Sequence, residues 1–491
     1  MRTPRTSEPK PSPSPQPLQD AKPDAADRLG TEPVGRLLLR FSIPSIGGML
    51  LNALYNVVDR IFVGRGVDEI ALGGISLVMP LMTLSMAFAM LFGIGAANMI
   101  SMRMGQGKRE DAENALNHCF FLLIAVGLLA TIIELALLDP LLAMLGAQDG
   151  SAAIGYARRY YRIILVGQVF FQLSFGLSHC SRAQGFPIMS LLSMVFGAGL
   201  NSILDPIFIF GFGWGVEGAA LATIISQFCA AVWILNFSFS RKALIRLRPG
   251  NLTPSFSIVK TIAAFGSASA LLQFAMSAVQ LLLNSSMGWY GEAALGVDNG
   301  GDIALSGMTI INSFTMFILM PVFGINQGAQ PVLGFNYGAK KFDRARRAYF
   351  LAVLAATCIC TAGFIVTRLF PGFIIRLFVP DGSPALMRVT GFALRTALLV
   401  LPLNGFQIVS SNMFAVTGRP KISILLAMLR QIILLAPFIL IFGRLWGLYG
   451  VIVAMPAADA VSVSITAIMI FLEFRQAGQL GLSYQQSLPG K

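Results

Sequence analysis

The sequence has few charged residues. Only 12% of its 491 residues are Asp, Glu, Lys or Arg, about half of the roughly 25% that a soluble domain carries, and its mean hydropathy is +0.71. The sequence instead contains apolar runs of about 20 residues, the length of a membrane-spanning helix. The strands of a membrane barrel would be about half as long and would alternate apolar and polar residues. Because a chain at membrane depth must satisfy its own backbone hydrogen bonds, these runs indicate helices. The composition excludes a soluble domain and predicts an all-α, polytopic membrane protein.

Residues that bind metals or act as nucleophiles are also scarce. The two histidines, His118 and His179, lie near the ends of apolar segments, and no nucleophile–base constellation is evident. We therefore expect no metal site and no enzyme activity. The net charge of +13 does not indicate nucleic-acid binding, since the basic residues lie between apolar segments, where they set membrane orientation. The cysteines lack ligand spacing and indicate small core residues: Cys119, Cys180, Cys229, Cys358 and Cys360.

The apolar runs predict twelve membrane helices. Residues 1–34 lack large apolar side chains and predict a disordered cytoplasmic tail without a signal peptide. The polar segment 241–257 predicts a cytoplasmic linker between two six-helix bundles, 35–240 and 258–475, and residues 476–491 predict a second cytoplasmic tail. The expected helices are 37–63, 70–97, 115–138, 160–182, 188–210, 216–239, 258–286, 303–326, 348–370, 388–414, 421–442 and 447–472.

The distribution of Lys and Arg predicts the orientation. With both termini inside, the inner segments hold 26 of the 36 basic residues and the outer segments hold 10. Removing the five in the N-terminal tail leaves 21 against 10, so the prediction does not depend on the tail. Both termini are expected in the cytoplasm, with the chain in a bacterial-type inner membrane.

An internal repeat links the two halves. The stretch 201–223 resembles 435–454, and both halves are predicted to have the same orientation. Parallel repeats of this kind place substrate between the halves, and one half rocks against the other. The matching pairs are Pro206 and Pro437, Gly211 and Gly443, Trp214 and Trp446, and Gly218 and Gly450.

Only the first repeat has an acid in this stretch. Asp205 lies in an apolar run, with Asn201 one helical turn before it. Counted from the glycine turns at 1.5 Å per residue, Asp59, Asp205 and Thr223 lie at one depth, about 7–9 Å below the outer surface. Such oxygen ligands suit a proton or Na⁺ and no transition metal. The acids could instead support helix packing, and Asn201 and Thr223 could be ordinary interhelical hydrogen bonders.

Several stretches together resemble the multidrug and toxic compound extrusion (MATE) family, and within it the MepA-like, DinF-related branch. They are LYNVVDRIFVGR (54–65), the loops GQGKREDA and NYGAKKFDRA, and LDPIFIFGFGWGVEGAALAT. The resemblance implies two six-helix bundles that form a V and export drugs or metabolites, coupled to H⁺ or Na⁺. It places a cation-responsive cluster on Asp59, Asn201, Asp205 and Thr223.

Other branches of this family have acids in the second bundle, where this chain has amides instead. We therefore expect a substrate cavity lined by some of the polar residues Gln273, Gln280, Asn284, Asn326, Gln407 and Asp459. Asp459 has two open interpretations. It could form a buried structural pair with Arg430 on the preceding helix, or attract cationic substrates into a cavity.

Together these observations predict a cation-coupled antiporter. It would exchange H⁺ or Na⁺ for cationic or amphipathic small molecules. We expect H⁺ to be the coupling ion rather than Na⁺, and we expect no other cofactor. The alternative is a flippase or exporter for a lipid-linked or specific metabolite cargo. The expected partners are the lipid bilayer and the substrate, with no nucleic acid, and we expect a monomer.

Overall fold

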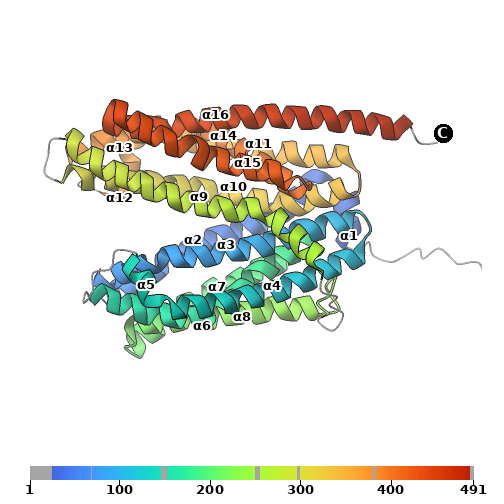
Figure 1. Cartoon of the computed structure of the whole chain (residues 1–491), viewed down its shortest axis with the longest axis horizontal. Helices are drawn as coiled ribbons and strands as arrows, with labels where there is room; N and C mark the ends of the chain where they lie inside the picture. Colours follow the sequence, from blue (N-terminus) through green and yellow to red (C-terminus); the bar gives the residue numbers. More distant parts are fainter. Residues whose placement is uncertain are drawn as a thin grey trace, which may run out of the picture.

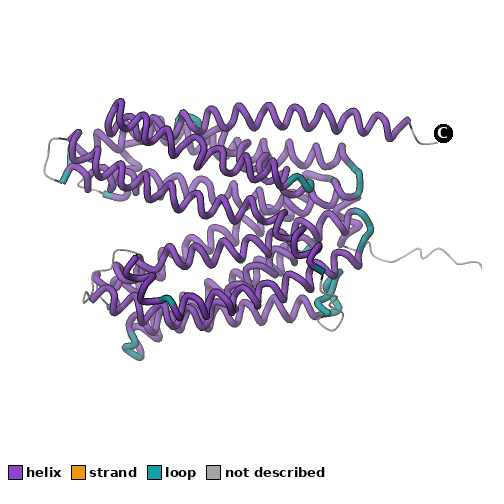
Figure 2. Tube along the Cα trace, in the orientation of Figure 1, coloured by secondary structure: helices purple, strands orange, loops and turns teal. Residues whose placement is uncertain are grey.

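The computed structural model describes residues 25–67, 69–144, 152–248, 255–295, 299–379 and 383–486. These residues form helices joined by short loops, and none of them lies in a strand (Figures 1 and 2). The predicted all-α membrane fold is confirmed, because ten of the helices are long and apolar enough to cross a membrane.

The first bundle contains six long helices, and Pro206 separates α7 from a short π-helical turn. Its helices are α2 (Val34–Gly66), α3 (Glu69–Gly105), α4 (Arg109–Ala136), α6 (Ala152–Ala183), α7 (Pro187–Pro206) with η1 (Ile207–Gly211), and α8 (Gly215–Phe239). Two short helices, α1 (Ala25–Thr31) and α5 (Leu138–Met144), lie at opposite ends of the molecule (Figure 1).

The second bundle repeats this plan with more interruptions. Its helices are α9 (Phe256–Leu295), α10 (Gly300–Gly338), α11 (Phe342–Leu369), α12 (Pro371–Phe378), α13 (Pro384–Ala397), α14 (Leu401–Val416), α15 (Pro420–Met428) with η3 (Leu429–Leu435), and α16 (Ala436–Gln486). The expected helix 388–414 is in fact a pair, α13 and α14, bent by 50°.

The last long apolar segment reverses direction. Pro420–Arg475 spans 56 residues, more than twice what one crossing needs. Gly447 inside α16 has a φ of 59°, which favours glycine. Just beyond it, Gly450 packs on the backbone of Phe442. Counting this segment as two crossings and the bent pair as one gives approximately the twelve that the sequence predicts.

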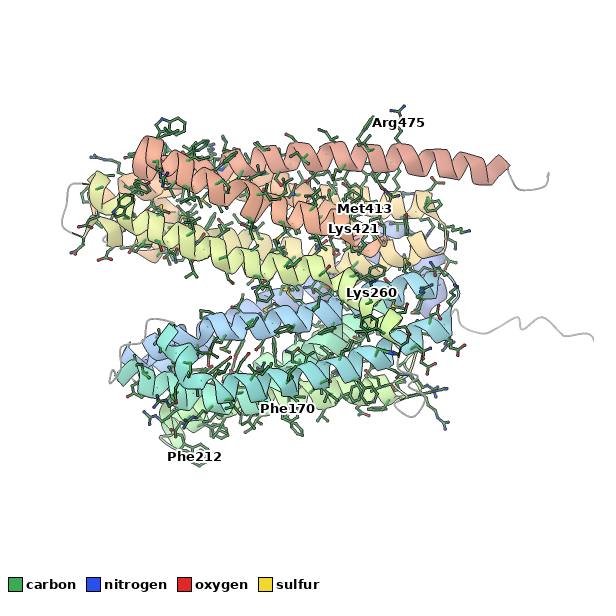
Figure 3. The ribbon with its side chains drawn as sticks, in the orientation of Figure 1. Phe170, Phe212, Lys260, Met413, Lys421 and Arg475 are labelled. Atoms are coloured by element: carbon green, nitrogen blue, oxygen red, sulfur yellow. The ribbon has the colours of Figure 1, made fainter. Side chains whose placement is uncertain are left out.

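The two bundles meet at one end only (Figure 1). We call this the terminal end, since α1 and the C-terminal end of α16 lie there, and the opposite end, with α5 and α12, the distal end. Lys260, Lys421 and Arg475 lie in the terminal half, and Phe212 lies at the distal end (Figure 3).

Glycines allow the bundles to approach closely in the terminal half. A Cβ on Gly266 of α9 would lie 1.8 Å from the carbonyl oxygen of Leu91 on α3. One on Gly105 would lie 2.0 Å from the carbonyl oxygen of Phe335 on α10. Backbone thus packs directly on backbone across the bundle boundary.

One expectation about a polar segment needs correction. Residues 25–31 form α1 rather than part of a disordered tail, because Leu29 is buried and its carbonyl accepts a hydrogen bond from Asn336. The remainder of the expected tail, residues 1–24, lies outside the described residues. Within the expected linker, residues 249–254 lie outside them too, whereas Ile245 and Leu247 are buried against the first bundle.

Candidate functional site

The centre of the candidate site is a polar cluster between α7 and α8. Asn201 and Asp205, one turn apart on α7, are 2% and 0% exposed. The Asn201 Nδ2 donates to Asp205 Oδ1 at 3.2 Å and to Thr223 Oγ1 of α8 at 3.2 Å. Thr223 in turn donates to the carbonyl oxygen of Ala219 at 3.0 Å. The structure therefore brings together three of the four residues that the sequence singles out.

The fourth residue, Asp59 of α2, completes the cluster. Its carboxyl group lies within interaction range of that of Asp205. Two carboxyl groups this close cannot both hold a negative charge in a low-dielectric site without a cation between them. The oxygen atoms of this cluster are of the type that holds a proton or a hard cation.

Two tyrosines beside the cluster were not predicted from the sequence. The hydroxyls of Tyr55 and Tyr160 interact with Thr223 and lie within electrostatic range of both acids. Tyr55 could have been found, since it precedes Asp59 by four residues and therefore shares its helix face. Tyr160 could not, because it lies on α6 and only tertiary packing brings it here.

A cavity of about 140 Å³ adjoins this cluster. Tyr55, Asn201 and Thr223 form part of its wall, and it continues along α6 past Phe175 to Arg182. Gln327 of α10 also borders it, so the cavity extends to the second bundle.

The polar residues expected to line a cavity in the second bundle do not border this one. Gln280 donates to Asn284 at 2.8 Å on an exposed face of α9, and Gln273 lies two turns before it. Asn326 is partly buried in α10, and Gln407 is buried and donates to Ser462 at 3.0 Å. The spacing of polar residues along each helix does not reveal that this cavity lies mainly in the first bundle, because that depends on how the helices pack.

Asp459 and Arg430 form an ion pair within the second bundle. Arg430 Nε donates to Asp459 Oδ1 at 2.6 Å, and its Nη2 donates to Oδ2 at 3.3 Å. Asn404 of α14 adds a hydrogen bond to the same carboxylate at 3.2 Å. This geometry matches the structural interpretation of Asp459, and the residue does not border the cavity described above.

Comparison with known proteins shows the same architecture. The family model MatE matches residues 44–207 and 268–441. The chain is 27% identical over 440 residues to the multidrug export protein MepA of Staphylococcus aureus (strain MRSA252), covering 90% of this chain and 94% of MepA. It is 25% identical to MepA of Staphylococcus haemolyticus (strain JCSC1435), covering 89% and 93%.

Two solved structures have similar folds. An outward-facing multidrug resistance MATE transporter of the MOP superfamily matches with a TM-score of 0.85 and 28% identity, covering 94% of this chain and all of that one. A MOP superfamily transporter from Pyrococcus furiosus, whose binding pocket is described as having reverse polarity, matches with a TM-score of 0.85 and 27% identity over 93% of this chain.

Proposed function

The chain belongs to the MatE family of multi-pass membrane transporters, and from this premise we propose that it exports drugs or other amphipathic organic compounds by cation-coupled antiport. The S. aureus relative is a multidrug export protein, which supports this class of cargo. The export would proceed across a bacterial-type inner membrane, outward from the cytoplasm.

The observation that carries the proposal is the pair of facing acids beside the cavity. The carboxyl groups of Asp59 and Asp205 lie within interaction range of each other. Asn201 donates to Asp205 and to Thr223, and both Asn201 and Thr223 form part of the cavity wall. An ion that neutralises the acids changes the charge at one end of the cavity. A cycle is driven only if the ion interacts differently with the two conformations. Because α2, α7 and α8 all contribute to the cluster, relative movement of these helices would change the ion's affinity.

A proton suits this cluster better than Na⁺ does. Hard cations generally take about six or more oxygen ligands. In this cluster the amide N–H groups of Asn201 already donate to Asp205 Oδ1 and to Thr223 Oγ1, so Na⁺ would have to displace these bonds before it could use both oxygens. A proton needs only the two facing carboxyls.

The packing of the bundles and the positions of the basic residues support an outward-facing state. The bundles make their closest backbone contacts at the terminal end. The bias of Lys and Arg favours a cytoplasmic location for that end. In this orientation the acid cluster is nearer to the outer surface, from which protons would enter.

The test uses purified protein in vesicles with an imposed pH gradient, with and without Na⁺. We expect gradient-driven transport of a fluorescent cation to be abolished in Asp205→Asn, which keeps the shape and removes the titrating group. Asp59→Asn should impair transport strongly, and Thr223→Ala more mildly. The matched control is Asp139→Asn, because Asp139 lies at the distal end with its side chain 61% exposed, paired only with Arg158 among the described residues.

Asp205→Asn should still bind substrate, more weakly where the basic group of the substrate faces the acids, which separates lost coupling from lost folding. Undiminished gradient-driven transport by this variant would overturn the mechanism. Transport that requires Na⁺ and ignores the pH gradient would replace the proton with Na⁺ and leave the antiport intact.

A further inference from the structure

Arg182 is a buried cation at the end of the cavity away from the acids. It lies in the last turn of α6 and is only 4% exposed, yet it borders the cavity. Its guanidinium donates to the hydroxyl of Ser190 on α7. Among the described residues, none of the eight ion pairs includes Arg182.

A buried guanidinium without a carboxylate partner is costly. Ionised groups removed from water are normally paired, and those within membrane segments usually mark a path for a substrate or an ion. One neutral hydroxyl uses one of the five N–H donors that a guanidinium carries. The remaining donors need an acceptor, and the cavity is where one can reach them.

His179 adds a second polar group at this end of the cavity. It precedes Arg182 by three residues on α6, is 3% exposed, and borders the same cavity. Its Nδ1 is buried and has no hydrogen-bond partner among the described residues. The ring packs against Phe175, with centroids 4.9 Å apart, which orients the imidazole. Two side chains one turn apart on α6 therefore border the same space, His179 and Arg182.

The cavity thus lies between opposite charges: Arg182 borders one end, and the acids lie behind Asn201 and Thr223, which border the other. Arg182 contacts α7 at Ser190, and the acid cluster contacts α7 at Asn201, eleven residues later. At 1.5 Å per residue these levels are about 16 Å apart along the helix. A molecule with one basic and one acidic group fits this arrangement better than a simple cation does.

We propose that Arg182 binds an acidic group of the cargo, so that the exported compounds include zwitterionic amphiphiles whose oxyanion lies at Arg182 and whose basic group points toward Asp59 and Asp205. The forked N–H donors of Arg match a carboxylate or a phosphate in bidentate geometry. The proposal rests on the proposed export function and specifies the cargo that the same cavity takes.

The size of the cavity agrees with this arrangement. About 140 Å³ is less than the roughly 300–1,000 Å³ of sites that enclose a drug-sized molecule. The cavity holds a ring with its acidic group, and the rest of the cargo extends toward the second bundle, where Gln327 borders the space.

A purely structural role for Arg182 predicts a different result. A basic residue in the last turn of a helix is stabilised by the helix dipole, and the bond to Ser190 would join α6 to α7. In that role Arg182 would affect folding and would not distinguish an acid from its ester. The test therefore compares two cargos that differ only in that group.

The experiment measures binding of rhodamine 110, which carries a free carboxyl group, and rhodamine 123, its methyl ester. Fluorescence anisotropy is recorded with the full-length protein in lipid nanodiscs, without any ion gradient. The variants are Arg182→Gln and Arg182→Lys, and the matched control is Arg103→Gln. Arg103 lies in the last turn of α3, is paired with Asp111, and does not border the cavity.

We expect the unmodified protein to bind rhodamine 110 about tenfold more tightly than its ester, as the loss of a hydrogen-bonded charge implies. Arg182→Gln should weaken binding of rhodamine 110 about tenfold and that of rhodamine 123 less than twofold. Arg182→Lys should keep part of the preference, and Arg103→Gln should keep all of it.

Equal binding of the two dyes by the unmodified protein would overturn the proposal, and this measurement holds even if a variant does not fold. Equal weakening of both dyes in a folded Arg182→Gln would assign Arg182 a structural role and would also overturn it. The outcome is independent of coupling. Failed gradient-driven transport with an intact dye preference would count against the proposed antiport alone.

Discussion

Replacing Gly266 by alanine should disfavour the conformation in which the bundles meet at the terminal end. A Cβ at this position would lie 1.8 Å from the carbonyl oxygen of Leu91, whereas real Cβ atoms essentially never come within 3.0 Å of such an atom. The helices α3 and α9 must therefore separate locally by at least 3.0 − 1.8 = 1.2 Å. Backbone faces backbone here, so no side-chain rotation relieves the clash.

The expected cost follows from overpacking. Inserting a methyl group into a close-packed contact typically costs about 1–3 kcal/mol, which shifts a two-state equilibrium about five- to 150-fold. Alanine also favours helices by about 1 kcal/mol over glycine, and that gain must be removed from the comparison. Gly288→Ala is the matched control, because Gly288 lies in the same helix and its added Cβ would meet Leu305 at an ordinary 3.6 Å.

The assay is a spin-label distance measurement between the distal ends of α3 and α9 in nanodiscs, together with thermal stability. In Gly266→Ala the distribution of spin-label distances should shift away from the distances of the state in which the terminal end is closed. Gradient-driven transport should also become slower. Gly288→Ala should be as stable as the unmodified protein or more stable, with an unchanged distribution. If the two variants behave alike, the close approach of α3 and α9 does not stabilise the closed terminal end, and the reasoning fails.

Two other predictions concern the ion pair of the second bundle and the orientation. Asp459→Asn should lower the free energy of unfolding by about 3 kcal/mol, at the lower end of the range for a broken buried pair, because Arg430 is still 29% exposed. Thermal unfolding should show partial recovery in Arg430→Leu/Asp459→Leu, whereas normal stability of Asp459→Asn with poor export of cations would assign the residue to a cavity. The orientation can be tested with a membrane-impermeant thiol reagent on intact cells, in a variant whose Cys358 is replaced by alanine. The reagent should label Ala294→Cys and should not label Lys242→Cys, and both positions are exposed. Labelling of Lys242→Cys from outside would reverse the assignment.

The spacing of residues along one helix predicts only part of the polar cluster. Asn201 and Asp205 are four residues apart on one helix, so their common face follows from helix geometry. Asp59 and Thr223 were matched to them by depth and by resemblance to a family, and the structure joins all four. Tyr160 was missed because its position depends on how α6 packs, and spacing along one helix contains no information about a neighbour.

The location of the cavity could not be predicted from residue spacing. The amides of the second bundle, such as Gln280 and Gln407, are the polar residues that a search by residue type finds, yet they bond to neighbours on their own bundle. In the sequence, nothing distinguishes Arg182 from the other 35 of the 36 basic residues. Its burial, and its lack of an acidic partner among the described residues, exist only after α6 and α7 have packed together.

The sequence by itself determined the class of the protein, since apolar runs of membrane length leave no other way to satisfy the backbone than helices. It also determined the family, the internal repeat and the two acids, because these are properties of order and spacing along the chain. Only the tertiary structure decided that the acids face each other, that Asp459 pairs with Arg430, and that a cavity of mixed polarity lies in the first bundle. Those features depend on contacts between helices far apart in the sequence, and such contacts are set by side-chain shape and backbone approach, as at Gly266, rather than by any periodicity within one helix.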